Sequence, residues 1–303
     1  MTLQNDNCLK SKALFIINPI SGGKKKDNVP DLIRKNLDDS LFEPTIVFTN
    51  RAFHGNKLAG KGVGEYDLIV AVGGDGTVNE IASAIAGTDT VLGVIPFGSG
   101  NGLARFLHIP MDTEKSILAL NEKRVETIDA AKLNRQWFFN MAGMGFDAHI
   151  AEVFSHHKTR GFGAYIKSSL KEIFTYKAEH YQIEIDGKRY DSDAFMLSFA
   201  NSSQYGNNAH VSPYASVQDG LIDVCIIKPF PVYKLIGLGL RMFRGTADRS
   251  PYVEIIRGKH ISIKRVGDGA VHLDGEPQIM GPVAEINVVP GALKIITGSG
   301  FRV

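Results

Sequence analysis

The stretch AVGGDGTVNEIASAIAG, residues 71 to 87, restricts the possible folds of this chain more than any other. It places Gly73, Gly74, Gly76 and one carboxylate, Asp75, between an apolar run and a segment with helical periodicity. Glycines at such a join let the backbone turn sharply and approach a ligand, because no Cβ stands in the way. From residue 78 to residue 85 the apolar residues recur at i, i+3, i+4 and i+7, the spacing of one helix face. The stretch predicts a strand, a glycine turn and a helix whose amino-terminal end binds an anion such as phosphate.

Asp75 needs an explanation of its own, because a carboxylate repels a bare phosphate. Its place beside a phosphate site indicates either a bound Mg²⁺ or a proton-accepting role. Thr77 follows near the predicted helix start, where its hydroxyl can cap free amides. The alternative is an ordinary strand-to-helix turn with an exposed Asp, since short glycine motifs often occur without a ligand.

The first part of the chain has the pattern of a parallel sheet with crossover helices. Four short apolar, mostly β-branched runs alternate with longer mixed stretches: ALFII (13–17), TIVF (45–48), LIVAV (68–72) and VLGVI (91–95). Two further glycine-rich stretches also follow such strands, namely NPISGGKKK (18–26) and IPFGSGNGLAR (95–105). Loops that follow parallel strands meet at one edge of the sheet, so the three stretches together predict a nucleotide cradle.

The pattern changes after about Glu126, where short extended runs are separated by Gly, Asn, Asp or Pro turns. This predicts a β-rich second domain, and 303 residues are enough for two domains. The stretches 161–177 and 230–245 interrupt the pattern with helical spacing and several Lys or Arg beside apolar residues. Each is a candidate for membrane-surface contact. The alternative is a helix packed on its own domain, with its cationic side chains extending to solvent.

Composition excludes several classes of protein. The net charge of +2 does not favour a dedicated nucleic-acid binder. Cys8 and Cys225 are the only cysteines, which supports neither a disulfide framework nor a structural zinc site and fits a reducing cytosol. The start of the chain lacks the apolar core of a signal peptide, and no apolar run reaches about 18 residues. We expect a cytoplasmic protein that contacts a membrane surface transiently. The sequence leaves the oligomeric state open, and a homodimer is one of the possibilities.

The common nucleotide fingerprints are absent. The chain has no Gly-x-x-x-x-Gly-Lys-Ser/Thr motif. In Gly98-x-Gly100-x-x-Leu103 a leucine stands where the dinucleotide motif needs Gly or Ala. A dehydrogenase is therefore disfavoured.

The glycine motifs instead resemble the ATP-binding motifs of the diacylglycerol kinase catalytic family, which includes bacterial lipid kinases and sphingosine kinases. The matching residues are Asn18-Pro19-x-Ser21-Gly22, Gly73-Gly74-Asp75-Gly76-Thr77-Val78-Asn79-Glu80 and Pro96-x-Gly98-Ser99-x-Asn101. Three later motifs follow in the family's order: Phe139-Asn140-x-Ala142-Gly143-x-Gly145-Phe146-Asp147, Asp219-Gly220-Leu221-Ile222-Asp223 and Asp274-Gly275-Glu276. The resemblance implies a three-layer α/β nucleotide-binding domain (1–128, with 291–303 returning to it) and a β-sandwich lipid-binding domain (129–290).

The resemblance also implies site residues. ATP would contact Asn18, Pro19, Ser21, Gly22, Thr49, Gly73, Gly74, Asp75, Gly76, Thr77, Val78, Asn79 and Ser99. Catalysis would involve Glu276, Asp274 and Asp75, with Glu276 as the proton acceptor and Asp75 as a rival base or Mg²⁺ organiser. A second Mg²⁺ would be held by Asp219 and by main-chain oxygens of Ser216 and Leu221. From the residues alone, both the Asp219 and the Asp274 motifs are plain hairpin turns, the second with a solvated Glu276.

The implied function is an ATP- and Mg²⁺-dependent lipid kinase of phospholipid metabolism. Diacylglycerol is the first choice of acceptor and a sphingoid base the second. Bacterial relatives usually have Asp where this chain has Gly102, and often a glycine run where it has Tyr205-Gly206-Asn207-Asn208, which leaves the acceptor open. The alternatives are an NAD kinase, which shares Gly-Gly-Asp-Gly-Thr, and a regulator without catalysis. The presence of all three acidic residues argues against the regulator.

Overall fold

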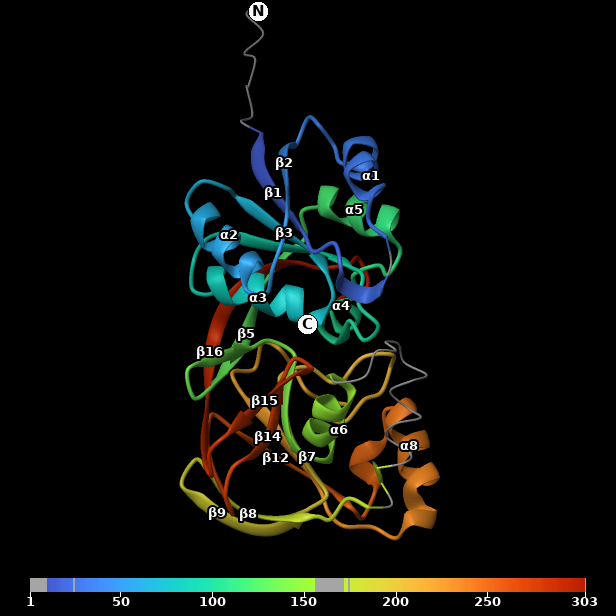
Figure 1. The fold of residues 1–303 in the computed structure, drawn as a ribbon, viewed down its shortest axis with the longest axis vertical. Helices are drawn as coiled ribbons and strands as arrows, with labels where there is room; N and C mark the ends of the chain where they lie inside the picture. Colours follow the sequence, from blue (N-terminus) through green and yellow to red (C-terminus); the bar gives the residue numbers. More distant parts are fainter. Residues whose placement is uncertain (1–9, 24, 156–171, 174, 303) are drawn as a thin grey trace, which may run out of the picture.

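The computed structural model describes residues 10–23, 25–155, 172–173 and 175–302. Two parts lie end to end, an α/β part that holds the amino-terminal strands and a β-rich part below it (Figure 1). This architecture confirms the expected fold class. Most of the stretch 161–177 lies outside the described residues. In the part of the chain that is described, no helix has the length and apolar character needed to cross a membrane.

The first part is a parallel sheet with helices on both faces. Its strands lie in the order β2, β1, β3, β4 and are β1 (Ser11–Ile17), β2 (Phe42–Phe48), β3 (Leu68–Gly73) and β4 (Val91–Pro96). Each contains one of the four predicted runs. The helices are α1 (Val29–Asn36), α2 (His54–Gly62), α3 (Asp75–Ile85), α4 (Gly102–Phe106) and α5 (Thr113–Asn121), with a 3-10 turn at Ser21–Gly23.

Side-chain alternation along the strands produces the three layers. In β1, Leu14 and Ile16 join the core under α2, α3 and α4, whereas Phe15 and Ile17 join the core under α1 and α5. Successive side chains of a strand point to opposite faces, so an almost wholly apolar strand is buried on both sides. The loops after β1, β3 and β4 consequently meet at one edge of the sheet.

The second part is a sandwich of two sheets. One sheet has the order β12, β11, β10, β7, β14, β15, and the other continues the first part's sheet through β16, β13, β8 and β9, with β5 on β16 and β6 on β5. The strands are β5 (Val125–Leu133), β6 (Gln136–Phe138), β7 (Met141–Gly145), β8 (Glu179–Ile185), β9 (Lys188–Ala194), β10 (Met196–Ala200), β11 (Ile222–Ile227), β12 (Val253–Gly258), β13 (His260–Arg265), β14 (Gly269–Leu273), β15 (Glu276–Met280) and β16 (Val283–Ile296). The helices are α6 (Phe146–Ser155) and α8 (Leu235–Phe243), with 3-10 turns at Val232–Lys234 and Ala247–Arg249.

The six-stranded sheet is apolar on both faces. Leu197 and Phe199 of β10 enter the core between the sheets, while Met196 and Ala200 enter a second core on the outer face. Ile150 of α6 and Leu238 of α8 belong to that outer core. Both helices are therefore held on the outer face of the sandwich.

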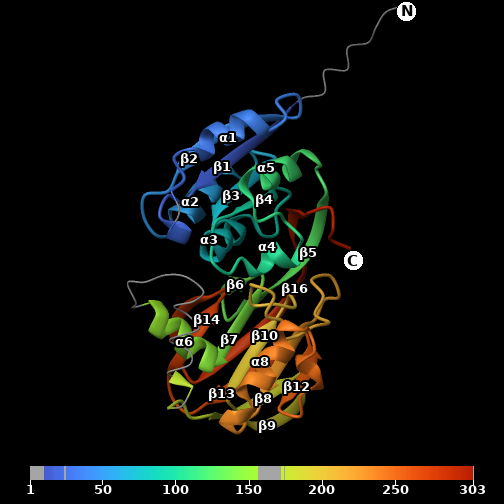
Figure 2. The same ribbon diagram turned by 90° about the vertical axis from the view of Figure 1, so that its right-hand side faces the viewer.

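Two long strands connect the parts, as Figure 2 shows. Strand β16 pairs with β13 and β5 in the second part and reaches β4 in the first, where Ile295 pairs with Leu92. Its register shifts between Val289 and Leu293, and the amide of Gly291 in this bulge donates to Asp129 Oδ1 (2.8 Å). The end of the chain thus returns to the first sheet. The boundaries at residues 128 and 291 fall inside β5 and β16, and the division into domains stays a prediction.

Candidate active site at the junction of the two parts

The three glycine loops pack directly on one another. A Cβ built on Gly22, which has φ +66°, would collide with the carbonyl oxygen of Phe97. A Cβ on Gly74 would lie 3.1 Å from the Cα of Gly98. Glycine is therefore needed at these two positions because one loop closely approaches another. Gly23 has φ +64°, and no atom of the described residues outside its chain neighbours lies within 4 Å of a built Cβ, so this position is open on that side.

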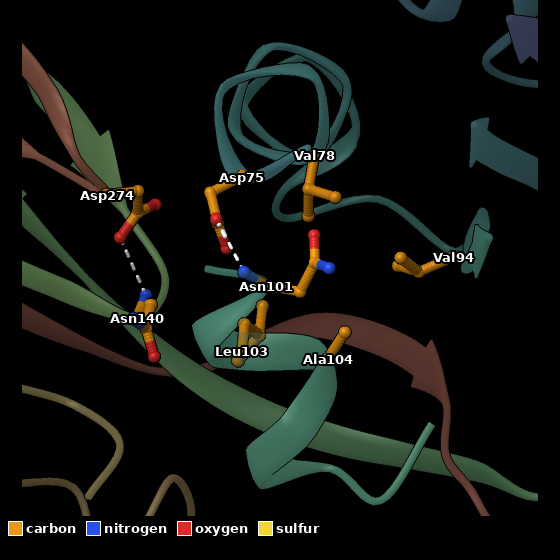
Figure 3. Close-up of a pocket in the computed structure, with 8 residues that line it drawn as sticks. All are labelled: Asp75, Val78, Val94, Asn101, Leu103, Ala104, Asn140 and Asp274. Atoms are coloured by element: carbon orange, nitrogen blue, oxygen red, sulfur yellow. Dashed lines mark hydrogen bonds between the residues drawn. The ribbon is translucent and has the colours of Figure 1, made fainter. Parts of the chain in front are cut away.

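Asp75 ties the second loop to the third (Figure 3). Its Oδ2 accepts the amide of Asn101 (2.8 Å), and its Oδ1 accepts the amide of Gly102 (2.9 Å). Asn101 adopts a left-handed conformation, φ 51°, and its side chain bonds both the amide and the carbonyl of Gly98 (2.9 and 2.8 Å). Burial raises the pKa of Asp75 to about 6, against the effect of the two amides. Asp75 therefore holds the loops together and is mostly ionised at neutral pH.

Asp274 ties the two parts of the molecule together. Its Oδ2 accepts the Asn79 side-chain amide (2.8 Å) and the Phe139 amide (3.0 Å), and its Oδ1 accepts the amides of Asn140 and Met141 (both 2.9 Å). Burial raises the pKa of Asp274, and these hydrogen bonds oppose the rise. A buried carboxylate with four protein donors is suited to holding the junction, and its predicted catalytic role stays a prediction.

Asn79 of α3 is the residue of the first part that bonds Asp274. Its Nδ2 donates to Asp274 and also to the carbonyl oxygen of Trp137 (3.0 Å). Both protons of this amide are thus directed at the second part. The predicted contact of Asn79 with ATP stays a prediction.

Glu276 follows a tight turn that brings it to the start of α3. Asp274 (φ 48°) and Gly275 (φ 87°) form the two-residue loop between β14 and β15, and Asp-Gly is a favoured sequence for such a turn. The plain hairpin interpretation is therefore correct for the backbone. The Glu276 side chain is exposed, and a Cβ built on Gly76 would collide with its Oε1. Glycine at position 76 leaves room for this carboxylate beside the amino-terminal end of α3.

A narrow pocket lies between Asp75 and Asp274 (Figure 3). It is lined by Asp75, Val78, Val94, Asn101, Leu103, Ala104, Asn140 and Asp274. Its volume of about 10 Å³ is the size of one water molecule. This pocket is too small for a nucleotide, whereas Pro19, Gly22, Ser99 and Glu276 are exposed on the solvent side of the loops.

The remaining predicted nucleotide residues lie deeper in the loops. Asn18 Nδ2 donates to the Thr77 hydroxyl (3.0 Å), which connects the first and second loops. The amide of Thr49 donates to the carbonyl of Ile17 at the end of β1 (2.9 Å), and Thr49 is buried. Gly73 and Val78 are also buried, and Ser21 is half-buried. The structure brings all of these residues to one sheet edge, and their contacts with ATP stay predictions.

Carboxylate oxygens are the donors that this junction offers to a metal ion. Within the described ranges no group of three or more His, Cys, Asp or Glu side chains gathers as a metal site. Asp75 and Glu276, on either side of Gly76, offer carboxylate oxygens of the kind Mg²⁺ accepts when it keeps waters and bridges phosphates. This donor set fits an ion that arrives with a triphosphate.

The Asp219 turn lies apart from these carboxylates, against β5. Asp219 is exposed, and its Oδ1 accepts the amide of Leu221 (3.0 Å). The amide of Gly220, φ 69°, donates to Asp129 Oδ2 (2.7 Å), and the Ser216 hydroxyl accepts the amide of Gln218 (3.2 Å). The turn is thus closed by protein groups, and its proposed Mg²⁺ stays a prediction.

A buried polar cluster lies beneath the Asp274 turn. Asp147 Oδ2 accepts the hydroxyl of Tyr205 (2.7 Å) and lies 3.1 Å from His272 Nε2. The amide of Gly275 donates to His272 Nδ1 (3.4 Å). Burial, together with the Asp147 carboxylate, raises the pKa of Tyr205. The only sequence signal was the place of Asp147 in a quoted motif, since its partners lie more than 50 residues away.

Glu80, the last residue of the second motif, also has a structural role. Its Oε1 accepts the amide of Phe53 (3.0 Å), and its Oε2 accepts the amide of Gly55 (3.2 Å). These amides belong to the start of α2, where free N–H groups need partners. Glu80 therefore caps α2 from the neighbouring helix.

Comparison with known proteins agrees with this geometry. Residues 12–133 match the diacylglycerol kinase catalytic domain, and residues 140–297 match the YegS C-terminal NAD kinase beta sandwich-like domain. The fold and site thus define a two-part protein with an α/β catalytic-type domain and a sandwich. The chain belongs to the diacylglycerol kinase catalytic family, in the form that carries a YegS-type second domain.

Individual relatives cover most of the chain. A diacylglycerol kinase from Staphylococcus saprophyticus is 28% identical over 275 residues, 88% of this chain and 90% of the relative. One from Staphylococcus aureus is 29% identical over 88% of this chain and 87% of the relative. A crystal structure of a diacylglycerol kinase from Bacillus anthracis superimposes with a TM-score of 0.74 at 20% identity, over 95% of this chain and 97% of the other. At this identity the structural likeness shows the fold.

Proposed function

We propose that the protein transfers the γ-phosphoryl group of ATP to a lipid hydroxyl, with diacylglycerol as the first choice of acceptor. The observation that carries the proposal is the exposed Glu276 carboxylate against Gly76, where three glycine loops meet the start of α3. The curated relatives named diacylglycerol kinase support diacylglycerol over a sphingoid base. Bacterial relatives usually have Asp at the position of Gly102, and glycine there resembles sphingosine kinases. A sphingoid base is therefore the second choice of acceptor.

The arrangement supplies what phosphoryl transfer needs. Backbone amides at the start of α3 and in the loops would stabilise the charge of the transferring group. Glu276 accepts the proton of the lipid hydroxyl. The hydroxyl oxygen of the lipid then bonds to the γ-phosphorus as the bond between that phosphorus and ADP breaks. Asp75 keeps the second and third loops in register. Mg²⁺, when bound, neutralises phosphate charge.

The location of the lipid acceptor determines where the protein would act. Long-chain diacylglycerol resides in a bilayer, so the protein would act as a cytoplasmic protein bound peripherally to a membrane. A soluble protein of this kind needs a surface that binds lipid, in addition to its catalytic groups.

The test is transfer of labelled γ-phosphate from ATP to a panel of acceptors in mixed micelles. The panel contains diacylglycerol, a sphingoid base, phosphatidylglycerol and NAD⁺, each with Mg²⁺ and with EDTA. We expect label on diacylglycerol, loss of transfer in EDTA and recovery when Mg²⁺ is restored. Label on NAD⁺ alone, or no label while ATP still binds, would contradict the proposal and favour the NAD kinase or the regulator.

A further inference from the structure

Helix α8 and the turn before it present apolar side chains on two opposite faces. The helix lies on the outside of the second part (Figures 1 and 2). On its inner face Leu238 is buried in the outer core, and Leu235 and Met242 are half-buried. This face accounts for the attachment of the helix to its own domain.

The outer face is apolar as well. Tyr233 is 78% exposed, Ile236 75%, Leu240 47% and Phe243 51%, and their spacing of i, i+3, i+7 and i+10 places them on one stripe. Val232 adds a fifth exposed apolar side chain. Five of the fourteen large hydrophobic side chains exposed in the described residues thus fall within twelve positions. A concentration of this kind marks an interaction surface.

The charges around the stripe favour an anionic occupant. Between residues 228 and 247 the chain has two lysines, two arginines and no Asp or Glu. Lys228 pairs with Glu254 (2.8 Å), and the Lys234 ammonium lies 5.3 Å from the centre of the Tyr233 ring. Lys234, Arg241 and Arg244 are exposed. Cations beside an apolar helical stripe suit the boundary between headgroups and acyl chains of an anionic bilayer.

Helix α8 is also connected to the candidate active site. The amide of His210 donates to the carbonyl of Met242 at the end of α8 (3.0 Å), and His210 Nδ1 bonds Ser203 Oγ (2.9 Å). In the same loop Asn207 Nδ2 donates to the carbonyl of Ser99 in the third glycine loop (2.9 Å). Helix α8 is therefore hydrogen-bonded to the loop that also contacts the third glycine loop.

We propose that residues 232–244 are the surface by which this protein docks on an anionic lipid bilayer, with the apolar stripe inserted and the three exposed cations at the headgroups. The inference rests on the proposed function, because it supplies the route from enzyme to membrane-bound acceptor.

The test is sedimentation of the full-length protein with vesicles of phosphatidylcholine alone or with 30% phosphatidylglycerol, a composition on the order of the anionic surfaces that attract basic segments. The docking variant is Ile236→Asp with Phe243→Asp. Val266→Asp is the matched control, because Val266 is 94% exposed in the turn between β13 and β14. We expect the docking variant to lose about tenfold or more in vesicle affinity, since both side chains bury apolar area in the bilayer. The control should bind as the wild type does, and all should melt at similar temperatures.

A second variant tests the charges. Lys234→Gln with Arg241→Gln and Arg244→Gln should lose about fivefold in affinity per cation on anionic vesicles and little on phosphatidylcholine. Equal binding of all variants, an equal loss in Val266→Asp, or no wild-type binding to either vesicle would overturn the proposal.

A short-chain, water-soluble diacylglycerol separates docking from chemistry. We expect both docking variants to phosphorylate it at the wild-type rate. Vesicle binding that depends on these residues, in a protein that phosphorylates no lipid, would support the docking surface and contradict the proposed function.

Discussion

At the scale of single residues, the charge of Asp75 affects both the packing of the loops and the pH dependence of stability. It accepts two amides from the third loop, and burial raises its pKa from 3.8 to about 6. Such a group favours the folded state most below its unfolded pKa, and this contribution is lost as the pH rises through 6. The sequence placed Asp75 correctly after a strand, but its partners at Asn101 and Gly102 depend on how two loops pack and had no local signal.

Comparison of the wild type with Asp75→Asn should expose this titration. We expect the wild type to lose about 1.5 kcal/mol of unfolding free energy, relative to the variant, between pH 5 and pH 7.5. The measurement is urea unfolding at a series of pH values for both proteins. Parallel stability profiles would show that Asp75 titrates near its unfolded pKa.

At the scale of elements, the hairpin of β14 and β15 was the part of the site that the sequence described best. Asp-Gly between extended runs predicts a two-residue turn, and the turn is present. Local sequence patterns could not predict the contacts of this hairpin, because Asp274 accepts a hydrogen bond from Asn79, which is 195 positions away in the sequence. The same limit applies to Glu276 and Gly76, which only the folded junction brings together.

Asp274→Asn should weaken the junction. An amide offers one acceptor oxygen where four donors converge, so buried N–H groups lose partners at a cost of about 1 to 3 kcal/mol each. We expect a loss of about 2 to 5 kcal/mol in stability, measured by chemical unfolding. Asp268→Asn, at an exposed position between β13 and β14, is the control and should be neutral. An unchanged midpoint in Asp274→Asn would rule out the junction role.

At the scale of the whole molecule, periodicity was enough to predict an α/β part followed by a β-rich part. The four predicted runs fall in β1 to β4, because strands buried on both faces have a near-continuous apolar sequence. Local patterns did not show that β16 joins the sheets of both parts, since strand pairing over long separations depends on the complete fold. Nor did they decide between packing and exposure for α8, which has an apolar stripe on each face.

We propose that the chemistry takes place at the junction of the two parts, and Glu276→Gln tests this most directly. Transfer of phosphate from ATP to diacylglycerol and the affinity for ATP would be measured for the wild type, Glu276→Gln and the exposed control Glu285→Gln. We expect kcat to fall by about 10² to 10⁴ for Glu276→Gln, the usual contribution of a positioned base, with ATP affinity unchanged and the control unaffected. A Glu276→Gln enzyme that keeps its kcat, or that loses ATP binding in proportion to its rate, would contradict this proposal.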